Sequence, residues 1–121
     1  MIDQINNAII ELDISYFSIS SYNGKDLVLQ GAIDFDASPK IKITFESVYY
    51  MSILTDFHID SLENKVTFFQ LQGDENRSFS IKNDILQGYL NYKIQIDGFK
   101  HKILPAEVYI SAETINYSLI N

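Results

Sequence analysis

"KIKITFESVYYM", residues 40–51, is the stretch that decides the fold class. Its first half alternates strictly, with Ile41, Ile43 and Phe45 on one side and polar side chains between them. Successive side chains of a β-strand point to opposite faces, so this pattern predicts a strand with one buried and one wet face. The alternation blurs at 48–51, which predicts either a β-bulge or a strand that is buried on both faces.

The same period of two continues on both sides of this stretch. Asn23-Gly24 lies between two β-rich runs, and this dipeptide favours a tight hairpin turn. "GDEN" (73–76) reads as a second hairpin loop. Alternating or β-rich runs occupy residues 14–35, 65–72, 77–82, 89–97 and 106–120. With turn signals about every ten residues, the sequence predicts an antiparallel β-sandwich or barrel of about seven or eight strands.

The first dozen residues have a different period. Apolar side chains recur there at helical spacing, at Ile2, Ile5, Ile9 and Leu12. We expect a short helix over 1–12, although the same residues could instead lead into a strand. No repeat or linker divides the chain, so 1–121 is predicted to be a single β-rich domain, with antiparallel strands over 14–119.

Composition and charge exclude several classes of function. The chain is 46% hydrophobic, which argues against wholesale disorder, and it has no cysteine for a disulfide or a thiolate nucleophile. Sixteen acidic and nine basic residues give a net charge of −7, without a basic cluster. Binding to nucleic acid or to an anionic membrane is therefore disfavoured. An acidic surface suits a partner with a basic face, although it also serves solubility alone.

The N-terminal residues lack the positive region, the long apolar run and the cleavage site of a secretory signal. No run approaches the roughly 18 apolar residues of a membrane helix. A cytoplasmic location is expected, and the usage of Ile, Asn and Lys suggests an AT-rich bacterial genome.

The stretch "LTDFHID", residues 54–60, is the strongest candidate for a metal site. In an extended strand Asp56, His58 and Asp60 would share one face, and carboxylate with imidazole is suitable metal chemistry. A straight row of three does not converge on one ion without a bend or a ligand from another strand. The competing interpretation is the wet face of an ordinary strand. No cofactor is predicted.

Paired aromatic residues are the best sequence signal for a protein partner. Three adjacent pairs occur, at 16–17, 49–50 and 68–69, and in a regular strand one ring of each pair points outward. Outward aromatic side chains are frequent anchors of interfaces. The candidate partner-binding residues are Tyr16, Tyr49, Tyr50 and Phe69. The alternative is a sheet covered on both faces, in which these rings fill a core.

Three functions follow from these signals. The first is a small non-catalytic interaction module that binds a protein through an acidic and aromatic surface, in one version an immunity or inhibitor protein that covers a basic active site. The second is a β-barrel that binds a small molecule. The third is a metal-dependent enzyme that uses Asp56, His58 and Asp60. Exposed strand edges could also pair between two copies of the chain, so a homodimer is a further possible assembly.

Overall fold

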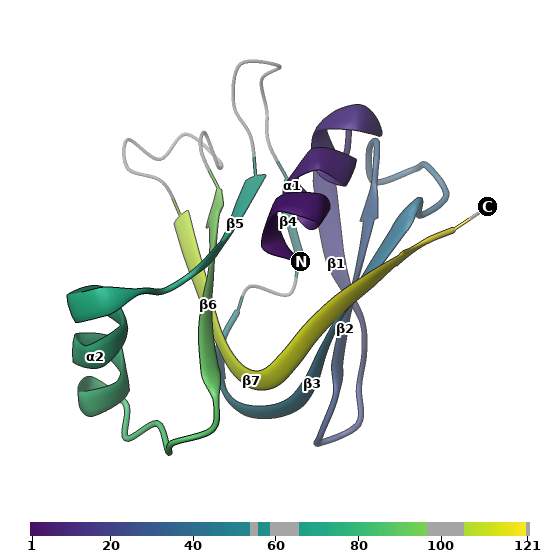
Figure 1. Ribbon diagram of the computed structural model, residues 1–121. Coiled ribbons are helices and arrows are strands. Elements are labelled where there is room, and N and C mark those ends of the chain that lie inside the picture. Colours follow the sequence, from purple (N-terminus) through teal and green to yellow (C-terminus); the bar gives the residue numbers. More distant parts are fainter. Residues whose placement is uncertain (54–55, 59–65, 97–105, 121) are drawn as a thin grey trace.

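The computed structural model describes residues 1–53, 56–58, 66–96 and 106–120, with the backbone alone for 56–58 and 106. Within these residues the protein is mainly β, with two short helices (Figure 1). The elements in chain order are α1 (Ile2–Glu11), β1 (Tyr16–Tyr22), β2 (Leu27–Ala32), β3 (Ile41–Ser52), β4 (Asp56–His58), β5 (Val66–Gln70), α2 (Gly73–Lys82), β6 (Leu90–Ile96) and β7 (Ala106–Leu119).

The strands form one antiparallel sheet in the order β4-β1-β2-β3-β7-β6-β5. In this order β4 and β5 are the two ends, so the described strands make an open sheet and not the predicted closed barrel or sandwich. Alternation in a sequence shows that one face is buried, but it does not show what covers that face. Here the sheet folds over on itself into two arms (Figure 1). One arm contains β4, β1 and β2, the other contains β6 and β5, and the long strands β3 and β7 run through both. The helix α1 lies between the two arms.

The fold in the sheet comes from the two longest strands, β3 and β7, which curve together (Figure 1). The register of β3 against β7 shifts between Val48 and Tyr50, which confirms the bulge predicted there. Ser47, just before the shift, has a positive φ of 55°. Its N–H donates to Oδ1 of Asp26 at 3.0 Å, and the N–H of Val48 donates to the carbonyl of Lys25 at 2.7 Å. The turn between β1 and β2 therefore stabilises the bend.

Both long strands change the phase of their buried residues at this bend. Phe45 pairs with Ile115 on one side of it, and Met51 pairs with Ile110 on the other. In β7 the buried positions pass from Ala112 to Ile115, three residues apart instead of two. Each arm can therefore turn an apolar face toward the same core.

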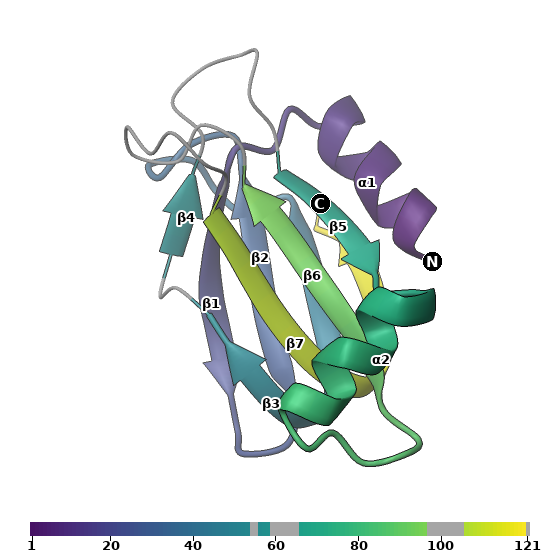
Figure 2. The same ribbon diagram turned by 90° about the vertical axis from the view of Figure 1, so that its left-hand side faces the viewer.

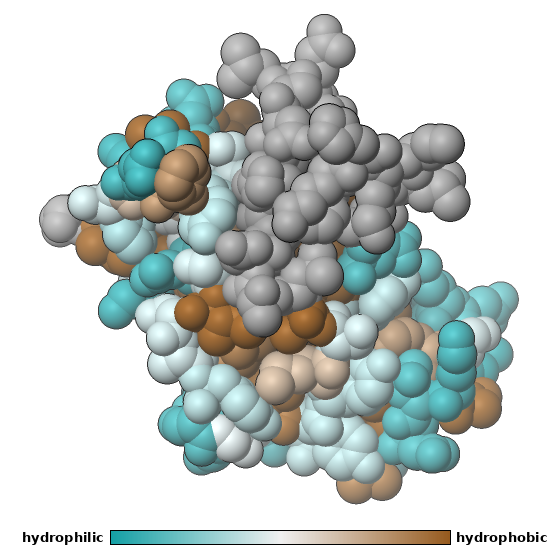
Figure 3. Space-filling view, turned by 180° about the vertical axis from the view of Figure 1, so that it is seen from behind, coloured by the Kyte–Doolittle hydropathy of each residue, from teal (hydrophilic) through white to brown (hydrophobic). Residues whose placement is uncertain are grey.

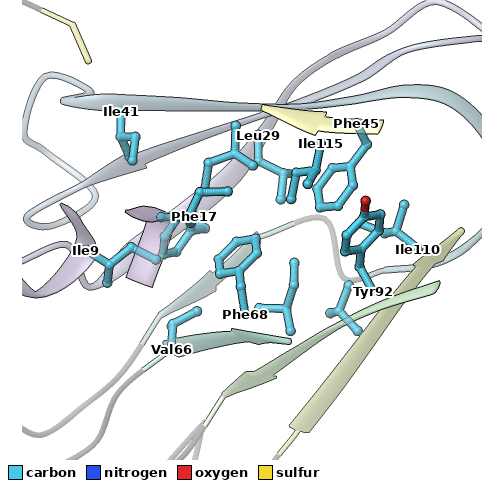
Figure 4. Packing of buried hydrophobic residues seen from close by; sticks show 14 of the residues in the cluster. Ile9, Phe17, Leu29, Ile41, Phe45, Val66, Phe68, Tyr92, Ile110 and Ile115 are labelled. Carbon is cyan, nitrogen blue, oxygen red and sulfur yellow. The ribbon is translucent and has the colours of Figure 1, made fainter. Parts of the chain in front are cut away.

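The core lies between the arms. The rings of Phe17 in β1 and Phe68 in β5 meet across it at 6.0 Å between centroids, and those of Phe45 and Tyr92 meet at 5.6 Å (Figure 4). The predicted N-terminal helix is confirmed. It contributes three buried side chains, Ile5, Ala8 and Ile9.

Gly31 in β2 is required by this packing. A Cβ atom there would lie 2.8 Å from Cγ2 of both Ile14 and Ile41 and 2.9 Å from Cε1 of Phe17. These distances are too short for real carbon contacts, so only glycine lets the strand approach the chain that leaves α1.

Two local predictions have different outcomes. The hairpin around Asn23-Gly24 is confirmed, since Tyr22 of β1 pairs with Leu27 of β2. The loop and strand predicted over 73–82 are wrong, because these residues form α2. Asp74 and Glu75 in its first turn and Lys82 in its last turn suit the helix dipole. The helix has no buried residue, so it lacks the apolar period by which a helix is recognised in a sequence.

Candidate partner-binding surfaces

The structure describes the predicted metal row only in part. Asp56 and His58 belong to β4, whose backbone pairs with Ser18 and Tyr16 of β1, while Asp60 falls outside the described residues. Their side chains are not described, so the metal site stays a prediction. Among the side chains that are described, no group of three or more acidic or histidine residues could hold a metal ion.

The four predicted partner-binding residues fall into two regions. Tyr49 and Phe69 are exposed, by 42% and 39%, and Tyr50 is half-buried. All three lie on the outer side of the arm that contains β5, β6 and β7. Tyr16 is half-buried on β1, in the other arm.

A row of contacts connects Phe69 with Tyr50 on the outer side of this arm. Nζ of Lys93 lies 5.2 Å from the ring centroid of Phe69, and Lys93 pairs with Tyr109 across the sheet. The ring of Phe79 in α2 stacks on Tyr109 at 5.0 Å and meets Tyr50 edge-on at 5.7 Å. We call these five residues the aromatic face. Figure 2 shows α2 at the lower end of this outer surface, beside the start of β6, and Phe69 remains exposed.

Tyr49 belongs to the same side because of the bulge in β3. Its ring lies 4.8 Å from that of Tyr89, and its hydroxyl donates to the carbonyl of Asp84 at 3.2 Å. In a regular strand Tyr49 and Tyr50 would point in opposite directions. Here Tyr50 contacts α2 itself, and Tyr49 contacts the segment that follows α2.

The helix α2 is attached to the sheet through a buried asparagine. Nδ2 of Asn91 donates to Oδ1 of Asn76 and to Oγ of Ser80, both at 2.8 Å. Oδ1 of Asn91 accepts from the hydroxyl of Ser111 at 2.5 Å. Asn91 and Ser111 are fully buried, so these bonds satisfy polar groups that water cannot reach.

Charges near the aromatic face are mainly negative. Burial, a hydrogen bond to Oε2 of Glu107 and the charges of Glu107 and Glu75 raise the pKa of Tyr109 to about 12. The phenol therefore stays protonated and donates to Glu107 at 2.5 Å. Glu75 also lies 3.6 Å from the ammonium of Lys93.

A cleft of about 640 Å³ opens where α1 stops short of the bend in the sheet. The N-terminal end of α1 forms one side, the ends of β5 and β6 form another, and the bend of β7 closes the third (Figure 1). The lining residues are Met1, Ile2, Asp3, Asn6, Phe68, Phe69, Gln70, Gln72, Leu90, Tyr92, Glu113, Thr114 and Ile115.

The cleft combines an apolar floor with an acidic rim. Phe68, Tyr92 and Ile115 are buried beneath it, and burial raises the pKa of the Tyr92 phenol. Met1, Phe69 and Leu90 are exposed at the rim. The rim also includes the carboxylates of Asp3 and Glu113, and the lining contains no lysine or arginine.

Hydrophobic residues also gather at the centre of the face seen from behind, beside the grey atoms (Figure 3). The aromatic face and the cleft are the two candidate surfaces that consist wholly of described residues.

Comparison with known proteins finds no matching family model, no matching curated protein and no matching solved structure. Neither described helix has the length and apolar character needed to cross a membrane.

Sequence reasoning found Phe69 but missed the rest of the cleft. Leu90, Gln70 and Glu113 are far apart in the chain and carry no motif. One signal was present: between Ala112 and Ile115 the period of two breaks, and the two residues skipped, Glu113 and Thr114, are both exposed at the cleft.

Proposed function

We propose that the protein is a non-catalytic interaction module whose cleft binds a protein partner with a basic segment. The observation that carries this proposal is the lining of the cleft, which joins exposed apolar side chains to two carboxylates without any lysine or arginine. Apolar contacts of this kind supply affinity, and complementary charge selects the partner.

The charge of the whole chain supports the same partner. A net charge of −7 favours encounter with a basic surface and repels acidic ones. Phe69 lies at the rim of the cleft and at one end of the aromatic face, so a large partner could bind both surfaces. An immunity or inhibitor protein in a bacterial cytoplasm is the specific version of this proposal.

A small-molecule binder is the second candidate, because the cleft has a volume typical of ligand pockets, which span roughly 300 to 1,000 Å³. The binding mode predicted from the sequence, a ligand inside a closed barrel, does not suit this open sheet. The contact of Phe17 with Phe68 fills the space between the arms of the sheet. The metal-dependent enzyme remains a prediction that rests on Asp56, His58 and Asp60.

Native mass spectrometry of the protein isolated gently from its own cells tests the proposal. The wild type should retain a stoichiometric basic polypeptide, and Glu113→Lys should lose it. Glu11→Lys is the matched control, since it makes the same change of charge at an exposed residue at the other end of α1. A polypeptide that Glu113→Lys retains as well as Glu11→Lys would contradict the role of the cleft. A retained small molecule would favour the second candidate.

A further inference from the structure

The edge of β5 is only partly covered. This strand is the last in the sheet, and among the described residues no strand pairs with its outer side. At Phe68 a side chain takes the place of a neighbouring strand. The N–H of Phe68 donates to Oδ1 of Asn6 at 2.8 Å, and Nδ2 of Asn6 donates to the carbonyl of Phe68 at 2.9 Å.

The same edge continues beyond Asn6 into the cleft. The backbone groups of a strand point to alternate sides, so those of Gln70 face the same side as those of Phe68. Gln70 lines the cleft together with the exposed residues Glu113 and Thr114 of β7. The cleft therefore offers backbone donors and acceptors next to an apolar floor and a carboxylate.

We propose that the partner binds as an extended polypeptide segment that adds to the edge of β5 at Gln70 and directs a lysine or arginine toward Glu113. Strand addition takes its affinity from main-chain hydrogen bonds and its specificity from alternate side chains. This inference rests on the proposed function and specifies how the cleft is used.

Charge complementarity identifies a basic segment as the occupant. Asp3 lies in the first turn of α1, where the helix dipole already offsets part of its charge. Glu113 lies at the bend of β7, and its exposed carboxylate is the freer of the two. An added strand would place every second side chain on the apolar floor formed by Phe68, Tyr92 and Ile115.

Short capped peptides of alternating lysine and valine provide the first test, with binding followed by the amide shifts of the isotope-labelled protein. Two further peptides carry N-methyl groups on alternate amides, one in each phase. We expect one phase to bind about tenfold or more weakly, because it blocks the hydrogen bonds to β5, and the other to bind like the unmethylated peptide. A peptide of alternating glutamate and valine should not bind.

Equal binding of both methylated phases, or no binding of the lysine peptide at millimolar concentration, would overturn strand addition. Neither result contradicts the proposed function if the Glu113→Lys variant still fails to retain the cellular partner. Conversely, a cellular partner that Glu113→Lys retains would refute the proposed function whatever the peptides do.

Variants of Gln70 supply a second test on the protein side. Gln70→Pro removes the edge N–H at the end of an edge strand, where proline is tolerated, and Gln70→Ala keeps it. We expect the proline variant to lose the lysine peptide and the alanine variant to retain it, with both showing the circular dichroism of the folded wild type. Equal affinities in the two folded variants would overturn the proposal.

Discussion

The two helices have the same length but are held to the sheet in different ways. Each has ten residues, but α1 buries Ile5, Ala8 and Ile9 in the core while α2 buries none. The second helix is attached through hydrogen bonds to Asn91 and through the ring of Phe79. The first is therefore part of the cooperative core, whereas the second lies on a sheet that has its own core without it.

This difference separates global from local stability. Removing apolar burial from α1 should destabilise the entire fold, since one core serves every strand. Disturbing the attachment of α2 should raise its local opening more than the unfolding of the sheet, because segments with few buried contacts open independently.

The largest effect is expected for Ile5→Ala. Ile5 is fully buried, and truncation of such a side chain costs about 3 kcal/mol. Urea denaturation should show this loss as a lower midpoint with an unchanged slope. The control is Ile10→Ala in the same helix, where the side chain is 65% exposed and the change should stay within about 0.5 kcal/mol. Equal losses in the two variants would mean that α1 does not complete the core.

A smaller effect, about 2 kcal/mol, is expected for Asn91→Ala, because the buried hydroxyl of Ser111 loses its acceptor and α2 loses two hydrogen bonds. Hydrogen exchange should accelerate in 73–82 more than in β3 or β7. The double variant Asn91→Ala/Ser111→Ala should recover part of the loss, since no buried hydroxyl then lacks a partner. Uniform acceleration throughout the sheet would show that α2 belongs to the cooperative core.

The smallest effect concerns pH, because Tyr109 is only half-buried and solvent screens most of the interaction of its charged form. The folded state raises the pKa of Tyr109 from 10 to about 12, so folding favours the protonated phenol. The stabilisation is complete below pH 10 and is lost as the pH rises from 10 through about 12. Tyr109 stacks on Phe79, so hydroxide should loosen α2 in this window. Hydrogen exchange is too fast there, and the near-ultraviolet circular dichroism of the aromatic residues is the suitable readout.

Tyr109→Phe is the control for the pH experiment, since it keeps the stacking and removes the titrating hydroxyl. The signal change between pH 10 and about 12 should shrink in this variant. A change of the same size would assign the effect to other tyrosines.

Local pattern was enough to predict α1 and most of the strands. The isoleucines of α1 repeat with the period of a helix, and Ile41, Ile43 and Phe45 repeat with the period of a strand. In α2 this rule fails, because the helix rests on Asn91 and not on an apolar stripe of its own. "GDEN" reads as a turn, yet Asp74 and Glu75 are also favourable in a first helical turn.

For the candidate surfaces, too, local sequence pattern predicts some features and not others. The exposure of Phe69 follows from its position next to the buried Phe68 in one strand, so sequence could predict it. The contact of Tyr50 with Phe79 depends on the placement of α2. The cleft depends on where α1 begins relative to the bend of β7, which is a property of packing, and its one local sign in the sequence is the broken period between Ala112 and Ile115.

The pairing of β3 with β7 has a consequence for the order in which the protein folds. The hairpins β1–β2 and β2–β3 join neighbours in the chain, whereas β3 is joined to β6 through β7, the last of the described strands in sequence. Contacts between such distant segments close large loops and slow the folding reaction. Until β7 pairs with both of its neighbours, part of the apolar surface of the early strands stays uncovered, and such incomplete states are prone to aggregation.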